Sequence, residues 1–430
     1  MATAAPPRTL RVGLLGYGTV GSGAYRMLRD NRDAICRKIG FGVEVVRIGI
    51  RDASKSRDLP AEIFTTDLQS IVDDPSIDVV VELIGGADLA GMLVERALDN
   101  GKNVVTANKE LMAKHGSRLV HLARDKGLDL HYEAAVGGGI PLIQPLKHQL
   151  AGNDVLGMMG ILNGTTNYIL TAMQERGADF GEVLTEAQTK GYAEADPSND
   201  VDGVDTAYKI SILASIAFGK QVPVEEVYRE GIRSVTDTDM KYADALGYRI
   251  KLLGIVDAVP DDKVRVRVHP SLVPKDHPLA SVNGVYNALW LHGDFVGDVM
   301  FSGRGAGSFP TASAVVGDLI DVGRNLAIGG QGSAIPYGMG MRTEGIDSLV
   351  TGQYLRILVV DKPMVLGSVA TTFGRHDVSI AAMEMRTLDE GRGEIVFLAH
   401  PCIERNFRAA LKELQSQQIV ERIANAIRVV

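Results

Sequence analysis

A glycine-spaced turn near the N-terminus constrains the fold of this 430-residue chain more than any other feature. Leu10–Leu15 is a short apolar run of the buried-strand type, and Thr19–Arg32 has helical spacing. Between them, Gly16, Gly18 and Gly21 follow the pattern G-x-G-x-x-G. The first glycine permits a tight turn, the second lets the backbone approach a pyrophosphate, and the third allows close strand–helix packing. The sequence therefore predicts a dinucleotide-binding turn, with a glycine-rich turn that binds no ligand as the alternative.

Strands and helices alternate through the first third of the chain, and this order predicts a parallel sheet with right-handed crossovers. The later strands are expected at Val43–Ile50, Val79–Ile84, Asn103–Thr106 and Leu130–Glu133, with further helices at Leu89–Asn100 and Lys109–Lys126. We therefore expect a Rossmann-type α/β domain over residues 1–133.

The remaining sequence predicts two more domains. A mixed α+β catalytic and dimerisation domain is expected over 134–325, with its last helix packing on the first domain. Its expected helices are Ile140–Leu150, Asn167–Arg176 and Asp205–Phe218, and its expected strands are Lys251–Val256, Lys263–His269, Val285–His292 and Phe295–Phe301. Residues 326–353 contain seven glycines and predict a linker. Residues 354–430 follow the order βαββαβ, which predicts a ferredoxin-like domain.

Composition argues against several classes of protein. The net charge of −8 gives no basic footprint for nucleic acid. No apolar stretch reaches the roughly 18 residues of a membrane span. Cys36 and Cys402 form no CxxC pair, which favours a reducing compartment. Met1–Pro7 lacks the plan of a signal peptide, so we expect a cytoplasmic protein that binds neither nucleic acid nor membrane.

The end of the second strand bears on the choice between NAD and NADP. NAD-binding proteins carry an acidic residue there for the ribose hydroxyls. In this chain Arg51 comes first, followed by Asp52, with Lys55 and Arg57 nearby. Arg51 suits a 2′-phosphate, and Asp52 suits NAD. We favour NADP, with a solvated loop charge as the alternative role for Arg51.

The segment Ala187–Lys209 combines an acidic loop with a lysine on an apolar helix. Its carboxylates are Glu194, Asp196, Asp200, Asp202 and Asp205. Lys209 follows Asp205 by four residues, so both side chains lie on one helical face. A lysine among apolar neighbours can be tuned toward proton transfer. The alternative is an ordinary surface ion pair between Asp205 and Lys209.

The same segment resembles the signature of the homoserine dehydrogenase family. The matching positions are Gly191-Tyr192-Ala193, Asp196-Pro197, Asp200-Val201, Gly203, Asp205 and Lys209. Further similar segments, in family order, are Gly13–Gly23, Val80–Gly86, Val104–Ala113, Tyr132–Pro141, Ile161–Leu170 and Phe301–Ala312. The resemblance implies reversible NAD(P)H-dependent reduction of L-aspartate 4-semialdehyde to L-homoserine, in threonine, methionine and isoleucine biosynthesis. Too few residues precede Leu10 for an aspartokinase region, so we expect the monofunctional form.

The resemblance also implies roles for individual residues. Lys209 would donate the proton to the substrate oxygen, and Asp205 would hold the hydroxyl end and orient the lysine. Glu194 would bind the substrate ammonium, with Asp200 and Gly191 in the same substrate loop. Lys109 is the second candidate acid/base. The implied cofactor contacts are Gly16, Tyr17, Gly18, Thr19, Val20, Gly21, Arg51, Gly85, Thr106, Lys109 and Gly305.

The segment Tyr132–Pro141 resembles the loop where family members bind a monovalent cation, usually sodium. The resemblance implies that the ligands are carbonyl groups, those of Glu133, Val136, Gly138 and Ile140. Glycine-rich turns can direct several carbonyls at one point. A hinge between domains is the alternative interpretation of the same glycines.

The C-terminal segment Leu355–Ile380 resembles an ACT domain, a module that binds small amino acids in biosynthetic enzymes. The pattern D-x-P-G-x-L has Met364 where glycine is expected. That glycine lets the backbone approach an effector, so a structural role in oligomerisation stands beside effector binding. Threonine is the effector to test first, and a homodimer or homotetramer is expected.

Two other functions stay open at this point. One is an NADP oxidoreductase acting on another amino-acid aldehyde or imine, which would need a different substrate loop. The other is a catalytically silent, nucleotide-binding amino-acid sensor. A sensor of that kind predicts losses among Glu194, Asp205 and Lys209, and all three residues are present.

Overall fold

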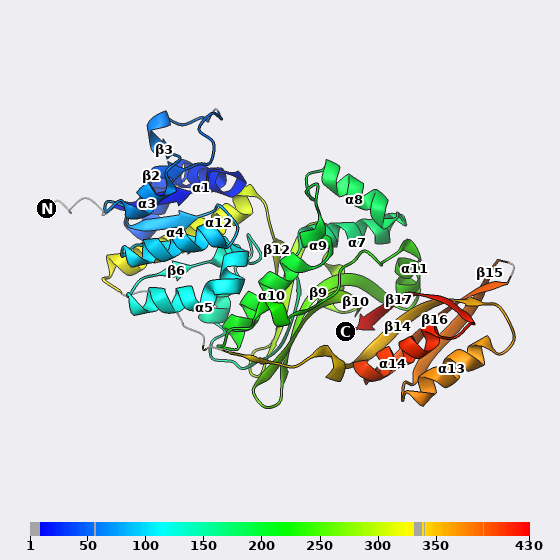
Figure 1. Cartoon of the computed structure of the whole chain (residues 1–430). Helices are drawn as coiled ribbons and strands as arrows, with labels where there is room; N and C mark the ends of the chain where they lie inside the picture. Colours follow the sequence, from blue (N-terminus) through cyan, green and yellow to red (C-terminus); the bar gives the residue numbers. More distant parts are fainter. Residues whose placement is uncertain (1–8, 56, 331–337, 339, 390) are drawn as a thin grey trace. The chain divides into compact units, whose positions relative to one another are not determined.

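The computed structural model describes residues 9–55, 57–330, 338, 340–389 and 391–430 (Figure 1). These residues group into two compact units, each built from separate stretches of chain. Unit 1 contains the segment up to Leu156, together with Tyr208–Glu225 and Asn287–Met341. Unit 2 contains Gly157–Ala207, Glu226–Tyr286 and Arg342–Val430. No helix in the described ranges is long and apolar enough to cross a membrane.

Unit 1 is built on a six-stranded parallel sheet with the strand order β3-β2-β1-β4-β5-β6. The strands are β1 (Thr9–Leu15), β2 (Gly42–Gly49), β3 (Phe64–Thr65), β4 (Val79–Glu82), β5 (Asn103–Thr106) and β6 (Leu130–His131). Residues of β4 and β5 are buried throughout, as expected when helices cover both faces of a parallel sheet. This strand order is that of the Rossmann fold, which confirms the expected class of the N-terminal part.

The helices of this sheet come from both ends of unit 1. They are α1 (Thr19–Asp30), α2 (Arg32–Ile39), α3 (Leu68–Asp73), α4 (Asp88–Asp99), α5 (Lys109–Asp125) and α12 (Ser308–Ala327). Helices α1 and α12 share one core, in which Ala24 and Leu28 belong to the same cluster as Val315 and Leu319. A distant segment of the chain thereby completes the core of the nucleotide-type sheet. Unit 1 also contains α6 (Ile143–Lys147), most of β11 (Tyr286–Gly293), and β12 (Gly297–Arg304).

Unit 2 contains a mixed sheet with the strand order β7-β9-β10-β17-β14-β16-β15. Its strands are β7 (Val155–Ile161), β9 (Tyr248–Val259), β10 (Lys263–Pro274), β14 (Val350–Val360), β15 (Ile380–Asp389), β16 (Arg392–Ile403) and β17 (Val420–Val429). Short strands β8 (Tyr228–Arg229) and β13 (Arg342–Thr343) also pair with β10. Residues Ser271 and Leu272 of β10 pair with β17, so one sheet continues from the middle of the chain to its end.

Among the residues that the structure describes, seven α-helices belong wholly or partly to unit 2. They are α7 (Gly164–Arg176), α8 (Phe180–Thr189), α9 (Ser198–Val201), α10 (Val204–Ala217), α11 (Asp237–Ala245), α13 (Val365–Arg375) and α14 (Glu404–Gln415). The order β14-α13-β15-β16-α14-β17 confirms the expected βαββαβ module. Its core groups three aromatic rings: the Phe373 centroid lies 4.5 Å from Phe397, edge-on, and 5.8 Å from Phe407, stacked.

A buried ionic network connects the C-terminal module to α11. Arg356 on β14 pairs with Asp239 at 2.7 Å and with Glu394 at 3.0 Å. The Asn425 amide donates to Asp239 and to the carbonyl of Ser234. Burial works against the charged carboxylate, but Arg356 outweighs it and lowers the pKa of Asp239. A buried pair whose remaining hydrogen bonds are also satisfied is costly to break from one side.

Local differences from the expected elements have identifiable causes. The helix expected over 140–150 is confined to α6, because Pro141 and the positive φ of Gly137 and Gly138 hold the preceding turn out of helix. Helices α3, α8 and α11 were not expected, and their N-caps are Asp67, Asp179 and Thr236. Part of the expected linker lies outside the described residues, and β14 already begins at Val350.

Met364 adopts a backbone conformation that favours glycine. Its φ is 76° at the N-cap of α13, and the residue is 82% exposed. The loop therefore keeps the geometry expected for D-x-P-G, although the side chain is large. A residue with a Cβ in this region of φ costs about 1–2 kcal/mol.

Met364→Gly should therefore raise the free energy of unfolding by about 1 kcal/mol, less the added entropy of glycine in the unfolded chain. Urea denaturation followed by circular dichroism measures this change. Met364→Ala is the matched control, because it removes the same side chain but keeps the Cβ. An equal gain in the alanine variant would show that backbone strain is not the cause.

Candidate active site

The three glycines of the first turn have different surroundings, as the sequence pattern predicts. Gly16 has a φ of 107°, and a Cβ there would lie 2.9 Å from the carbonyl oxygen of Leu83. A Cβ on Gly21 would lie 2.2 Å from the carbonyl oxygen of Gly16. No heavy atom lies within 4 Å of a Cβ built on Gly18, the N-cap of α1. Gly16 and Gly21 thus permit close packing, whereas Gly18 leaves space at the N-terminus of α1, where a phosphate is favoured.

The remaining residues of this turn begin α1 or pack beside it. Thr19 and Val20 lie in the first turn of the helix. Tyr17 packs edge-on against Phe64, with ring centroids 5.5 Å apart, and against Tyr25 at 6.1 Å. These aromatic contacts hold Tyr17 in place on the side of the glycine turn that faces the end of β2.

The loop after β2 carries the bases Arg51, Lys55 and Arg57 together with two acids, Asp52 and Asp58. Arg51 and Lys55 are exposed, and the Arg57 guanidinium lies over the Phe64 ring at 5.3 Å. Asp52 accepts hydrogen bonds from Ser54, from the backbone nitrogen at 2.9 Å and from the hydroxyl at 2.6 Å. These bonds lower the pKa of Asp52 and engage its carboxylate within its own turn.

Thr106 lies inside the wall of the site. Its hydroxyl donates to Glu82 Oε2 at 2.6 Å and accepts from the backbone nitrogen of Asn108. Glu82 in turn accepts from the backbone nitrogens of Ile84 and Gly85. Thr106 therefore shapes the Gly85 loop through Glu82, a residue that sequence reasoning missed. The available signal was a lone carboxylate at the end of an otherwise apolar strand.

A cavity of about 260 Å³ lies within unit 1. It brings together Gly85, Lys109, Gly138, Lys209 and Gly305, which sequence reasoning had placed in different sites. The other lining residues are Gly86, Ala107, Asn108, Glu110, Ala134, Ala135, Gly137, Ala306 and Thr311. Two lysines line this one cavity, so it favours a ligand that carries or develops negative charge.

Two glycine turns interlock at the cavity wall. A Cβ on Gly138 would lie 2.5 Å from the carbonyl oxygen of Gly305. A Cβ on Gly305 would lie 2.1 Å from Cγ of Asn287, and Gly139 donates to the carbonyl of Arg304 at 3.0 Å. A side chain at Gly138 would displace the Gly305 turn, and a side chain at Gly305 would displace Asn287.

The segment proposed for a cation begins at a buried carboxylate. The Glu133 side chain accepts from three backbone nitrogens, those of Leu142, Ile143 and Gln144, at 2.6–2.8 Å. Only its carbonyl is therefore suited to bind a cation. The positive φ of Gly137 and Gly138 curves the chain between the Val136 and Ile140 carbonyls. Among the residues that the structure describes, no cluster of three His, Cys, Asp or Glu side chains suits a metal.

Beneath Glu133 lies a buried group of titratable side chains. Asp318 accepts from the backbone nitrogen of Glu133 at 2.9 Å, and burial raises the pKa of Asp318 to about 7. Burial opposes a charged imidazolium at His131, but Asp129 and Asp318 outweigh it and raise the pKa of His131. This group fixes the position of Glu133 through the hydrogen bond that the Glu133 backbone nitrogen donates to Asp318.

Asp205 and Lys209 are both buried on helix α10, at 2% and 9% exposure. A solvated surface pair, the alternative considered from spacing, does not fit this burial. Lys209 lines the cavity of unit 1, whereas Asp205 belongs to unit 2. The continuous helix sets the two side chains one turn apart.

Asn163 joins the two acids of the substrate loop. Its amide nitrogen donates to Asp200 at 2.6 Å and to Asp205 at 2.9 Å. Its amide oxygen accepts from the backbone nitrogen of Thr166 and caps α7. The sequence marked this asparagine as part of a family-like segment, without a role. The geometry gives it one, which is to position two carboxylates.

The other acidic side chains of this loop are either already hydrogen-bonded or paired within the protein, or available to bind a ligand. Asp196 bonds to the backbone nitrogen of Ser198, and Asp202 pairs with Arg233 at 2.6 Å. The Glu194 side chain is exposed and makes no hydrogen bond or ion pair with any described residue. Gly191, with a φ of 74°, ends α8 and starts the loop. Glu194 is therefore available to bind a cationic group.

Together, the parallel sheet, the glycine turn at a helix N-terminus and the lysine-lined cavity define a dinucleotide-dependent oxidoreductase. Family models agree. Residues 16–133 match the homoserine dehydrogenase NAD-binding domain, 141–320 match homoserine dehydrogenase, and 353–417 match the ACT domain.

Individual relatives give the same result. The chain is 47% identical to a homoserine dehydrogenase of Synechocystis sp., over 98% of this chain and 99% of the relative. It is 40% identical to one of Bacillus subtilis, over 98% of each. The crystal structure of a homoserine dehydrogenase from Thiobacillus denitrificans superposes with a TM-score of 0.93 at 41% identity, covering 99% of both chains. The chain belongs to the homoserine dehydrogenase family, and its activity is that of this oxidoreductase.

Proposed function

We propose that this chain reduces L-aspartate 4-semialdehyde to L-homoserine with NADPH, and that Lys209 carries the proton. The observation that carries this proposal is the burial of Lys209 in a cavity walled by the Gly85, Gly138 and Gly305 turns. Such a site keeps an ammonium group where water is limited. An ammonium there stabilises an oxygen that becomes negatively charged far better than one in open solvent.

The chemistry then divides among the chain's own residues. The bound cofactor supplies a hydride to the aldehyde carbon. Lys209, as an ammonium, stabilises the growing charge on the aldehyde oxygen and donates a proton to it. Asp205 holds the hydroxyl end of the substrate and orients Lys209, and Glu194 binds the substrate ammonium, supported by Asp200. Oxidation of homoserine needs neutral Lys209 as a base, so it is favoured at alkaline pH.

Lys209→Met should lower turnover by about 10²–10⁴-fold, because the variant loses the general acid. Absorbance at 340 nm with homoserine and NADP⁺ measures the rate, and fluorescence titration measures cofactor binding. Lys109→Met tests the second lysine of the cavity and should affect cofactor binding more than proton transfer. Lys126→Met, at the C-cap of the helix that Lys109 begins, is the control. Near-normal turnover in Lys209→Met with intact cofactor binding would exclude Lys209 as the proton donor.

The proposed preference for NADP rests on the charges after β2. Asp52 is engaged by Ser54, while Arg51 and Lys55 are exposed. A hyperthermophilic archaeal homoserine dehydrogenase has been solved in complex with NADPH, and it matches 73% of this chain at 28% identity and a TM-score of 0.63. The exposed guanidinium is suited to pair with a 2′-phosphate.

Arg51→Ala should raise the KM for NADP⁺ about tenfold and leave the KM for NAD⁺ nearly unchanged. The basis is that a hydrogen bond to a charged group is worth about 1.5–3 kcal/mol. Steady-state kinetics with both cofactors measures the selectivity. Arg47→Ala, a substitution earlier on β2, is the control. An equal rise in the KM for NADP⁺ and the KM for NAD⁺ would mean that Arg51 does not bind the 2′-phosphate.

We further propose a monovalent cation, to be tested first as sodium, at the carbonyls of Glu133, Val136, Gly138 and Ile140. The curved turn at Gly137 and Gly138 supports it, as does the capture of the Glu133 carboxylate by three backbone nitrogens. Activity should rise on adding sodium and fall when choline replaces it at constant ionic strength. Equal activity in both salts would favour the hinge interpretation.

The ACT module is proposed to bind threonine, with assembly of a homodimer or homotetramer in the cytoplasm. The glycine-like backbone at Met364 supports an effector loop of the usual shape. Calorimetry with threonine tests the effector, and a lack of response would favour the purely structural role.

A further inference from the structure

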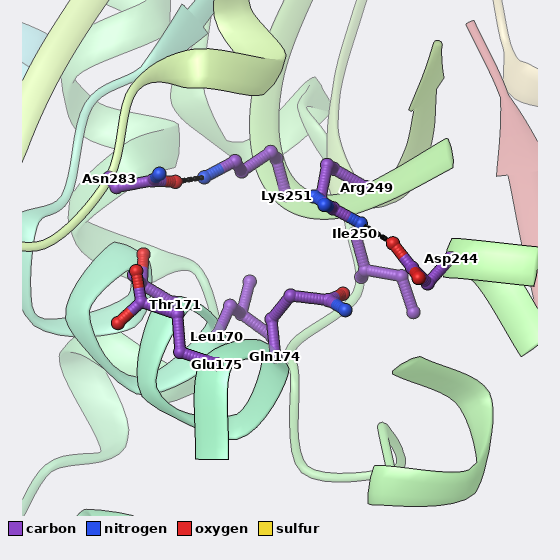
Figure 2. A pocket seen from close by; sticks show the side chains of 9 residues that line it. All are labelled: Leu170, Thr171, Gln174, Glu175, Asp244, Arg249, Ile250, Lys251 and Asn283. Carbon is purple, nitrogen blue, oxygen red and sulfur yellow. Dashed lines mark hydrogen bonds and ion pairs between the residues drawn. The ribbon is translucent and has the colours of Figure 1, made fainter. Parts of the chain in front are cut away.

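A second polar cavity, of about 270 Å³, lies within unit 2 and is not used by the proposed reaction. Figure 2 shows its walls, which come from the C-terminal half of α7, the start of β9, the end of α11, and Asn283. Drug-sized ligands occupy pockets of about 300–1,000 Å³, so this cavity suits a smaller molecule.

The deepest charged group of the cavity is an ammonium without a counter-ion. Lys251 is 2% exposed, and its Nζ donates to the Val282 carbonyl at 2.6 Å, to Asn283 Oδ1 at 3.0 Å and to Asn167 Oδ1 at 3.2 Å. All three acceptors are neutral, and no described carboxylate lies within ion-pair distance of Nζ. A buried charge held only by neutral oxygens remains costly, so an anion in the cavity would be favoured.

Two acceptors of the same cavity lack a donor. Oε1 of Gln174 is buried and has no hydrogen-bond partner. Glu175, the next residue of α7, is exposed and makes no ion pair with any described residue. The other acid of the cavity, Asp244, is already paired with Arg249 and Lys275. The Gln174 and Glu175 side chains point in different directions in Figure 2, and Glu175 is the one that lies on the Asn283 side, so Glu175 offers a site for a cationic group.

We propose that this cavity binds a small α-amino acid as its zwitterion. The carboxylate is held at the Lys251 end, where the Asn283 amide, whose oxygen already accepts from Lys251, offers its nitrogen as a donor (Figure 2). The ammonium is held by the Glu175 carboxylate, which lies on the Asn283 side of the cavity in Figure 2. One ligand thus supplies both an anion for Lys251 and a cationic group for Glu175. This site is separate from the substrate loop and does not depend on the roles proposed for Glu194 and Lys209.

The protonation of Lys251 gives an independent signal of binding. Burial, together with the like charge of Arg249, lowers the pKa of Lys251 to about 8, and Glu175 acts in the opposite direction. Asp244 faces the same space but is engaged by Arg249. A ligand carboxylate beside Lys251 raises its pKa, so binding near pH 8 takes up protons from the buffer.

Isothermal titration calorimetry of the full chain tests the proposal. The probes are glycine, L-alanine, L-serine and L-threonine, with acetate and methylammonium as the separate halves of the zwitterion. At least one amino acid should bind with proton uptake near pH 8, shown by titration in two buffers of different ionisation enthalpy. Acetate and methylammonium should each bind more than tenfold more weakly than that amino acid.

Variants separate this cavity from every other amino-acid site on the chain. Glu175→Gln should weaken amino-acid binding severalfold, and Lys251→Met should weaken it tenfold or more and abolish the proton uptake. Glu182→Gln, an exposed substitution on α8, is the matched control. Lys251→Met leaves three acceptors unpaired, so Asn283→Ala replaces it if that variant fails to fold. Wild-type affinity in both Glu175→Gln and the second variant, or no binding of any of the four amino acids, overturns the proposal.

Discussion

The active-site cavity depends on backbone segments that approach more closely than side chains would allow. The Gly138 turn meets the Gly305 carbonyl, and Gly305 meets the Asn287 side chain, at separations that leave no room for a Cβ. Gly21 similarly lies against the Gly16 carbonyl at the nucleotide turn. Because several turns share these contacts, the cavity wall is fixed by packing and not by flexible side chains. The two lysines then project into a space whose shape is already set.

The charged groups of the site are held by a second layer of buried polar contacts. Asn163 spans Asp200 and Asp205, and Glu82 spans Thr106 and the Gly85 loop. In both cases directional hydrogen bonds hold a carboxylate in one orientation. The C-terminal module is anchored in the same manner through Arg356 and Asp239. At these positions, buried hydrogen bonds between polar groups fix the geometry.

Much of this arrangement is predictable from the sequence. The glycine spacing at residues 16–21 and the strand–helix alternation predict the parallel sheet, and the βαββαβ order predicts the C-terminal module. The Asp205–Lys209 spacing predicts a shared helical face, but it cannot predict burial, because burial depends on distant segments. The roles of Asn163 and Glu82 were also out of reach. Each acts through partners more than twenty residues away, and the local signals, a helix-cap asparagine and a lone carboxylate at the end of an apolar strand, do not identify those partners.

The division into units was equally hidden from local patterns. Helix α12 completes the core of a sheet that begins three hundred residues earlier in the chain, since its apolar face packs with α1. We expected this last helix of the catalytic region to pack on the first domain, but its apolar spacing does not identify the residues of α1 that it contacts. The strained backbone at Met364 has a related origin, because the fold of the module imposes a left-handed conformation that methionine alone would avoid.

The central claim is that the amine of Lys209 exchanges the proton with the substrate oxygen. The pH dependence of homoserine oxidation under saturating cofactor tests it most directly. The account predicts a rate that rises with pH to a plateau in the wild type, and a slow, nearly pH-independent rate in Lys209→Met. An unchanged rising limb in that variant would assign the proton to another group and contradict the account.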